Sequence, residues 1–451
     1  MSQAELGAAA PLVPPRRRRP SLWRSLVMFF SIIGPGIITA NADNDVGGIA
    51  TYSLAGAQFG YTMLWLLIPL TVALIVTQEM CARMGAVTGK GLADLIRENF
   101  GVKVTAVVLV LFVLGDLGNT AAEFAGIASA SPILQSYAAS PVALLLSKFV
   151  LVPLAALFVF TMVTRGNYKI VERVFFAFCV VYLAYVGSAL LVHPDWGAVL
   201  HATVVPHFTP NAAYILTAIG VIGTTISPWM QFYIQSAVVE KGVRIKEYPY
   251  SRLDVVSGCV ITDVIAFFII VSSAATIFAY NAHVPAGHHP LVINDAGDVA
   301  AALAPLAGKY ASLLFALGLL NAAIFTASIL PLSTAYYVCE AFGFESGVEQ
   351  RFRSAPVFYS FYLALIVIGG GFVLIPGAPL LATIFYSQVL NGVLLPILLV
   401  LMLILINDRR LMGRYVNGLA FNVVAWATVA VMGMLTLVSV VQQLVAPSGV
   451  G

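Results

Sequence analysis

The sequence is poor in charged residues, and this scarcity excludes a soluble protein. Asp, Glu, Lys and Arg make up 10% of the 451 residues, whereas hydrophobic residues make up 60%. A soluble domain carries about 25% charged residues and could not remain dispersed with so little polar surface. The mean hydropathy of +0.95 instead indicates a polytopic membrane protein.

Cysteine is scarce as well, and a cleavable signal pattern is missing. The four cysteines are scattered in or beside apolar segments without a CxxC pair, which excludes a disulfide framework and a zinc site. The first 24 residues are rich in Pro and Arg, and a full-length apolar segment follows them. We expect residues 1–24 to be a disordered, basic, cytoplasmic tail. The packing cysteines are Cys81, Cys179, Cys259 and Cys339.

Long apolar runs occupy most of the chain, and about eleven of them can cross a bilayer core of roughly 30 Å. We therefore expect an all-α integral membrane protein with a single transmembrane domain over residues 25–445. The expected spans are 25–57, 61–82, 103–130, 141–163, 173–192, 211–240, 253–280, 311–338, 355–376, 380–406 and 417–443.

Basic residues are distributed unevenly between the two sides of these spans. With the amino terminus inside, all but two of the 23 Lys and Arg residues, namely Lys148 and Lys309, fall in segments on the inner side. Because positive charge is retained in the cytoplasm, we expect a multi-pass protein of the plasma membrane. Its amino terminus is then cytoplasmic and its carboxyl terminus extracellular.

Two spans, the first and the sixth, contain residues that do not suit a continuous helix. The first includes the polar run IITANADNDVGGIATY at 37–52, and the sixth is interrupted near Pro228. Broken helices at matching positions of two five-helix halves are typical of an inverted repeat with a substrate site between the breaks. We expect the halves at about 25–192 and 211–406, followed by an extra helix at 417–443.

The first break offers oxygen ligands for a cation. Gly47 and Gly48 permit unwound backbone, which frees carbonyl groups near Ala42, and Asp45 supplies a negative charge. Further candidate ligands are Asp43 and Asn44. The alternative interpretation is a short solvated turn between two re-entrant segments, although ionisable residues at membrane depth are usually functional.

The second break, GTTISPWMQ at 223–231, adds hydroxyl groups. Pro228 ends the first half-helix, and Thr224, Thr225 and Ser227 offer oxygen atoms. The alternative is that these hydroxyls only bond to carbonyls of their own helix. Carboxylate, carbonyl and hydroxyl oxygens together suit a hard cation such as Mg2+.

The stretch GPGIITANADNDVGGIATYSLAGAQFGY at 34–61 resembles the first helix of the Nramp divalent-metal transporters, whose pattern is GPG, then Asp-Pro-Gly-Asn, then AGAQFGY. Similar pieces are RMGAVTGKGLADLIRENFG at 83–101, the segment 218–238, and SQVLNGVLLP at 387–396. The resemblance spans nearly all of the apolar chain. It implies the LeuT-type fold and transport of a divalent metal, with the ion as substrate and no cofactor.

Carried over by position, the family's metal site implies four ligands in this chain. The metal-binding Asp falls on Asp45, the two carbonyl ligands on Ala42 and Thr224, and the amide ligand on Gln388. Gly48 takes the place of the family's Asn, so the cavity should be wider. A wider cavity suits Mg2+, which gives up its water reluctantly.

Other departures concern ion preference and protons. Ser227 replaces a Met whose thioether favours Mn2+ and Fe2+ over Mg2+. Trp229 and Thr120 replace the His and Asp of the family's proton route, of which only Glu123 remains. All six His residues fall in or beside expected external loops. This pattern is similar to the divergent Nramp-related magnesium transporters, which are not coupled to protons.

We therefore expect an importer of divalent cations that favours Mg2+ or also carries Mn2+, embedded in the lipid bilayer, with no nucleic-acid partner and no enzymatic activity. A proton-coupled Mn2+ or Fe2+ symporter of the same fold is the alternative. A sodium-coupled amino-acid transporter is disfavoured because Asp45 would repel a carboxylate substrate.

Several other polar residues lie in or beside the spans. Asp116 and Asp263 either line the ion path or sit at the edges of their spans, and a remote alternative uses them as an intramembrane aspartyl protease pair. Glu79 and Arg83 are expected to form an internal ion pair. The loop NAHVPAGHHP at 281–290 is interpreted as solvated rather than metal-gathering.

Overall fold

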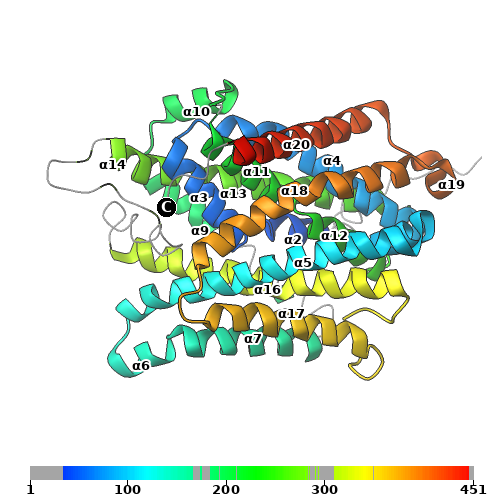
Figure 1. Ribbon diagram of the computed structural model, residues 1–451, viewed down its shortest axis with the longest axis horizontal. Helices are drawn as coiled ribbons and strands as arrows, with labels where there is room; N and C mark the ends of the chain where they lie inside the picture. Colours follow the sequence, from blue (N-terminus) through cyan, green and yellow to red (C-terminus); the bar gives the residue numbers. More distant parts are fainter. Residues whose placement is uncertain are drawn as a thin grey trace, which may run out of the picture.

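The computed structural model describes residues 34–165, 173–174, 183–191, 193–209, 211–282, 284, 290, 293, 309–348 and 350–445, and the regular elements in these residues are helical. The long helices run side by side along one direction, with short helices at both ends of the bundle (Figure 1). The elements are α2 (Pro35–Asn41), α3 (Val46–Phe59), η1 (Leu64–Leu66), α4 (Leu67–Thr88), α5 (Leu92–Ser136), α6 (Ser140–Leu145), α7 (Lys148–Arg165), α9 (Leu183–Leu191), α10 (Trp196–Val204), α11 (Ala212–Thr225), α12 (Pro228–Glu240), α13 (Tyr248–Ser273), η2 (Ala274–Phe278), α14 (Ala279–Ala282), α16 (Lys309–Phe342), α17 (Pro356–Leu374), α18 (Leu380–Asn407), α19 (Arg409–Met412), η3 (Gly413–Tyr415) and α20 (Leu419–Val445).

The membrane segments correspond closely to those expected from hydropathy. Among the described residues, nine helical segments are long and apolar enough to cross a membrane. The first expected span is present as α2 and α3, two short helices separated by residues 42–45. Part of the fifth expected span, the tail 1–24 and most of the loop 281–290 lie outside the described residues.

Helix α5 is longer than the expected span 103–130 because it includes a preceding segment. Its 45 residues bend at Gly101, whose φ of +78° is a conformation that favours glycine. The residues before the bend include Arg97 and Glu98, which do not suit the apolar interior of a bilayer. Only the part after Gly101 is therefore suited to crossing the membrane.

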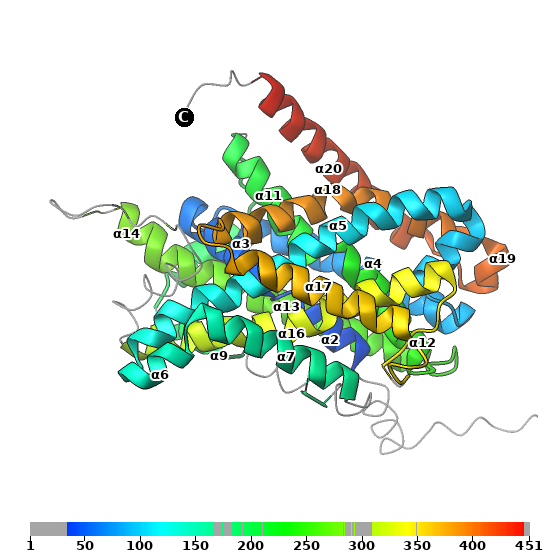
Figure 2. The same cartoon turned by 60° about the horizontal axis from the view of Figure 1, so that its bottom comes forward.

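Helix α5 packs along α16, α17 and α18, while α13 packs along both α2 and α3. Helix α20 lies outside, and its carboxyl-terminal part stands away from the bundle in Figure 2. Cys81, Cys259 and Cys339 are buried free thiols, as expected of packing residues. Cys179 lies outside the described residues.

The start of α2 is held by a carboxylate from α13. Asp254 Oδ1 accepts the amide hydrogens of Gly34 and Ile37, each at 3.2 Å, and Oδ2 accepts that of Gly36 at 2.7 Å. The two backbones also touch, since a Cβ added to Gly258 would lie 2.7 Å from the Gly36 carbonyl oxygen. Helix α2 is thus joined to α13 independently of its connection to α3.

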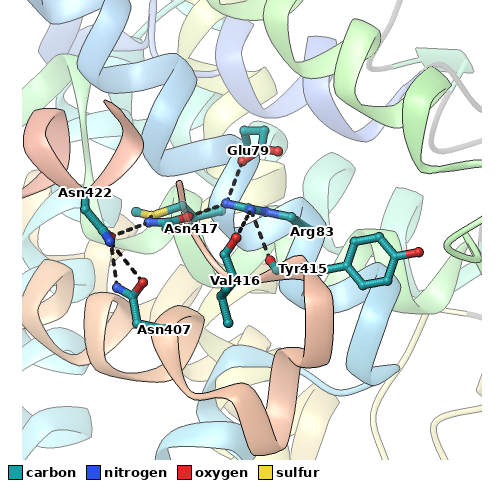
Figure 3. Close-up of polar contacts among 8 residues, drawn as sticks. Glu79, Arg83, Asn407, Tyr415, Val416, Asn417 and Asn422 are labelled. Atoms are coloured by element: carbon teal, nitrogen blue, oxygen red, sulfur yellow. Dashed lines mark hydrogen bonds and ion pairs between the residues drawn. The ribbon is translucent and has the colours of Figure 1, made fainter. Parts of the chain in front are cut away.

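A polar network joins the end of α4 to the segment between α18 and α20 (Figure 3). Arg83 Nη2 lies 3.2 Å from Glu79 Oε2, which confirms the internal ion pair expected from the sequence. Arg83 also donates to the carbonyl oxygens of Tyr415 at 3.0 Å and Val416 at 3.3 Å. The network continues through the side-chain amides of Asn417, Asn422 and Asn407.

Candidate metal site at the two helix breaks

The first break is capped by one of the predicted ligands. Helix α2 ends at Asn41, and Asp45 is the N-cap of α3, where its Oδ1 accepts the amide hydrogen of Gly48 at 2.5 Å. Asp45 is only 2% exposed. The alternative of a solvated turn is therefore wrong, because the polar run lies inside the protein.

The carbonyl group of Ala42 is free of helical hydrogen bonding for a specific reason. In a continuous helix it would accept the amide hydrogen of Val46, four residues later. That N–H instead points to Glu123 Oε2 at 3.4 Å, and the Ala42 oxygen accepts a hydrogen bond from the Thr326 hydroxyl at 3.3 Å. The oxygen thus lies at the break with its remaining lone pair available.

At the second break, Pro228 has the corresponding effect. Helix α11 ends at Thr225 and α12 begins at Pro228, which has no N–H to donate to the Thr224 carbonyl. The Ser227 hydroxyl donates instead, to the carbonyl oxygens of Gly223 at 2.9 Å and Thr224 at 3.0 Å. Ser227 therefore bonds to carbonyls of its own broken helix, which was the alternative to a ligand role. Thr225 does the same, since its hydroxyl donates to the Val221 carbonyl at 2.7 Å.

The two breaks meet beside Gly48. A Cβ added to Gly48 would lie 2.4 Å from the Asp43 carbonyl oxygen, 3.3 Å from Thr224 Oγ1 and 3.4 Å from Asp45 Oδ1. Thr224 Oγ1 is buried and has no hydrogen-bond partner among the described residues. The absence of a side chain at Gly48 thus allows oxygen atoms from both broken helices to approach one another closely.

Gln388 of α18 lies directly on the first break. A Cβ added to Gly47 would lie 1.8 Å from Gln388 Nε2, so only glycine leaves room for this amide. Gln388 Oε1 accepts a hydrogen bond from Asn391 Nδ2 at 3.0 Å. The structure therefore brings the predicted amide ligand to the same place as Asp45.

Two further amides adjoin the site and were missed by the sequence analysis. Asn119 and Asn391 exchange hydrogen bonds of 2.8 and 3.2 Å between α5 and α18. Asn391 also lies 3.4 Å from Ser227 Oγ. The sequence feature that could have indicated Asn391 is its position three residues after Gln388, on the same face of one helix.

Glu123 of α5 contacts Asp45 directly, carboxyl to carboxyl. Its Oε1 has no other partner among the described residues.

One turn earlier, the Thr120 hydroxyl donates to the Asp116 carbonyl at 2.7 Å. Helix α17 presents only Gly369 to Thr120, since a Cβ added there would lie 2.9 Å from Thr120 Cγ2. No charged side chain of α17 can therefore fill that position.

The remaining candidates occupy different surroundings. Asp116 is buried inside α5 and accepts hydrogen bonds from Thr334 and Tyr337 of α16, both at 2.8 Å. Asn44 uses its amide group to bond Thr262 of α13, at 2.5 Å to Oγ1. Asp263 is buried in the middle of α13 and lies near enough to Asp43 for their charges to repel. Neither Asp116 nor Asp263 sits at a span edge, and they lie on separate helices with different partners.

The ligand types are those of a site for a hard cation. The carbonyl ends of α2 and α11 carry partial negative charge toward the breaks. Among the described residues, no three or more His, Cys, Asp and Glu side chains gather as a metal cluster. The described histidines are His193, His201 and His207, which lie beside or within α10 at one end of the bundle.

A cavity of about 510 Å3 approaches the breaks between α3, α11 and α18. Its lining includes Leu54 and Thr217, which lie about 10 to 13 Å along their helices from the breaks. Phe385 packs below them, 3.4 Å from the position of a Cβ on Gly220. The cavity is therefore separated along α3 and α11 from the buried oxygen atoms of the breaks.

A family model described as natural resistance-associated macrophage protein-like matches residues 36–442. The chain belongs to the Nramp family. The divalent metal cation transporter MntH of Burkholderia ambifaria is 25% identical over 411 residues, covering 89% of this Nramp chain and 87% of that protein. MntH of Ralstonia nicotianae is 28% identical over 432 residues, covering 92% and 91%.

Solved transporters share the fold. A manganese transporter of Eremococcus coleocola superposes with a TM-score of 0.73 at 20% identity, over 96% of this chain and 90% of that one. MHP1, a nucleobase-cation-symport-1 family transporter, gives 0.56 at 15% identity over 90% and 89%. This Nramp protein is therefore a membrane transporter with the LeuT-type fold, and not an enzyme.

Proposed function

We propose that this protein transports a divalent metal cation bound at the meeting point of the two breaks. The ligands are the Asp45 carboxylate, the carbonyl oxygens of Ala42 and Thr224, and the Gln388 amide. The observation that carries the proposal is the close approach of oxygen atoms from both broken helices at Gly48. The divalent-cation transporters among its relatives support it.

The preferred ion, we propose, is Mg2+, with Mn2+ as a second substrate. Position 227 of the second break carries a serine hydroxyl and not a thioether, so this position does not favour a softer ion. Gly48 and Ser227 are both small, which leaves room for an ion that keeps part of its water. The Asn119–Asn391 pair supplies amide groups that can bond to such water molecules.

Transport is proposed to occur without proton movement. Thr120 faces Gly369, and Trp229 is buried at the start of α12, so neither position can carry a proton. The alternative is a proton-coupled Mn2+ or Fe2+ symporter, and the direct contact between Asp45 and Glu123 favours it. The manganese transporter of similar fold also favours this alternative.

We infer that the protein imports its ion across the plasma membrane as one transmembrane domain, with two inverted halves and α20 as an added helix. The segments after α4, α12, α16 and α18 carry nine of the 23 Lys and Arg residues, and they lie at the end marked by α12 and α19 in both views. The positive-inside rule makes that end cytoplasmic. The amino terminus is then inside and the carboxyl terminus outside.

Ion uptake into proteoliposomes tests these proposals. We expect Mg2+ uptake to exceed Mn2+ uptake, with Ca2+ compared in parallel and internal pH recorded by a trapped dye. Uptake of Mn2+ with internal acidification, and little Mg2+ uptake, would support the symporter instead. Failure to transport any of the three ions would contradict the divalent-cation assignment.

A further inference from the structure

Two buried carboxyl groups lie on the other side of the first break from Glu123. Asp43, in the break, is 2% exposed, and Asp263, in the middle of α13, is 5% exposed. None of their four carboxyl oxygens has a hydrogen-bond partner among the described residues. Their charges repel each other, and that of Asp45 acts on Asp43 in the same sense.

The groups next to these carboxyls offer oxygen lone pairs rather than protons. The Tyr52 hydroxyl adjoins Asp43, but it lies 2.8 Å from Thr225 Oγ1, whose own proton is donated to Val221. The Tyr52 proton is therefore directed to Thr225. The Thr71 hydroxyl adjoins Asp263, but it donates to the Leu67 carbonyl at 2.7 Å.

Burial of unpaired carboxylates is strongly unfavourable unless a cation compensates them. The remaining polar side chains around the pair are already engaged: Asn44 donates to Thr262, and Cys259, one turn before Asp263, donates to Gln78 Oε1 at 3.8 Å. Neither the Cys259 thiol nor the Tyr52 hydroxyl can carry a positive charge. The environment is thus rich in oxygen acceptors, and its two carboxyl groups can supply two negative charges to a bound cation.

We propose that Asp43 and Asp263 form a second binding site for a hard divalent cation, next to the transport site but separate from it. Two carboxylates match the charge of one divalent ion, and Mg2+ is commonly held by one or two carboxylates while it keeps several waters. Asp45 faces Gly48 and Glu123 of α5, whereas Asp43 faces α13, so the two sites use different carboxylates. The proposal deepens the proposed function, on which it rests for the nature of the ion.

Counting bound ions tests the proposal. The purified full-length protein in lipid nanodiscs is titrated with Mn2+, free Mn2+ is measured by electron paramagnetic resonance, and Mg2+ is added as competitor. We expect two competable ions per wild-type chain and one ion per chain in each of the variants Asp45→Asn and Asp263→Asn. Asp43→Asn should match Asp263→Asn, and Glu98→Gln, which removes a carboxylate on the protein surface, should still bind two.

Each other outcome is informative. One ion per wild-type chain, lost in Asp45→Asn but retained in Asp263→Asn, would overturn the second site and leave the proposed function intact. One ion lost in both variants would mean a single shared site and would also overturn it. Two ions in Asp45→Asn would instead contradict the transport site. The ion retained by Asp263→Asn shows that this variant folds; if it does not fold, Asp43→Asn decides the question.

Discussion

Glu123 accepts the amide hydrogen of Val46 at 3.4 Å, across the interface between α5 and the first broken helix. This contact takes the place of the backbone hydrogen bond that would otherwise continue α2 into α3. It also places the Glu123 carboxyl against that of Asp45. One residue of α5 therefore helps both to keep the helix open and to define the charge at the proposed ion site.

Asp45→Ala is expected to abolish ion uptake while the protein remains folded. The variant loses the carboxylate that lies against Gly48, whereas loss of the N-cap costs only about 1 kcal/mol of stability. Uptake in proteoliposomes and the thermal unfolding midpoint measure the two effects. Asp45→Asn keeps a capping oxygen and serves as the control for stability. Mg2+ uptake at the wild-type rate in Asp45→Ala would refute the site.

Gly48→Ala should reduce uptake by about tenfold or more. The added methyl group would lie 2.4 Å from the Asp43 carbonyl oxygen and would fill the space between the two breaks. Gly371→Ala on α17 is the matched control, because a Cβ there meets nothing within 4 Å. If both variants transport equally well, the ion does not bind beside Gly48.

Ser227→Met is expected to shift ion preference from Mg2+ toward Mn2+. The substitution introduces a polarizable sulfur and removes the hydroxyl that bonds Gly223 and Thr224. The ratio of Mn2+ to Mg2+ uptake is the measurement. Ser227→Ala loses the same hydroxyl without gaining sulfur, so its ratio should stay near that of the wild type. An unchanged ratio in an active Ser227→Met variant would show that residue 227 does not face the ion.

Mg2+ uptake is expected to leave the internal pH unchanged. Thr120, which faces Gly369, has no titratable side chain, so Glu123 alone remains of the family's proton route. A pH-sensitive dye trapped in proteoliposomes reports proton entry during uptake. Acidification that follows Mg2+ entry and disappears in Glu123→Gln would contradict uncoupled transport and support the symporter.

Arg83→Met should destabilise the protein by about 3 to 5 kcal/mol, because it leaves Glu79 buried without its partner. The double variant Glu79→Gln with Arg83→Met should recover part of this loss, since no unpaired charge then remains. Thermal unfolding in detergent measures both. Lys90→Met removes an exposed ion pair with Glu98 and should change stability by less than about 1 kcal/mol. Equal effects of Arg83→Met and Lys90→Met would show that the buried network contributes little.

The broken helices and the residues at their breaks could be predicted from the sequence because their causes are local. Pro228 lacks an amide hydrogen wherever it occurs, and two glycines beside an Asp in an apolar run signal an interruption. The Asn119–Asn391 pair could not be predicted in this way, since it depends on how α5 and α18 pack. The sequence also left open which hydroxyls of the second break face the ion. In the structure, the Thr224 hydroxyl has no partner among the described residues, whereas the Ser227 hydroxyl donates to the Gly223 carbonyl.

The role of Asp254 could not be predicted from the sequence either. It lies at the start of a span, where a charged residue is ordinary, and its partner Gly34 is 220 residues away in the sequence. Its three hydrogen bonds to the start of α2 have a mechanical consequence. Because its backbone hydrogen bonds to α3 are interrupted at residues 42–45, α2 is held at its start by α13. Any motion that opens the ion site by swinging α2 must then carry α13 with it or break all three bonds.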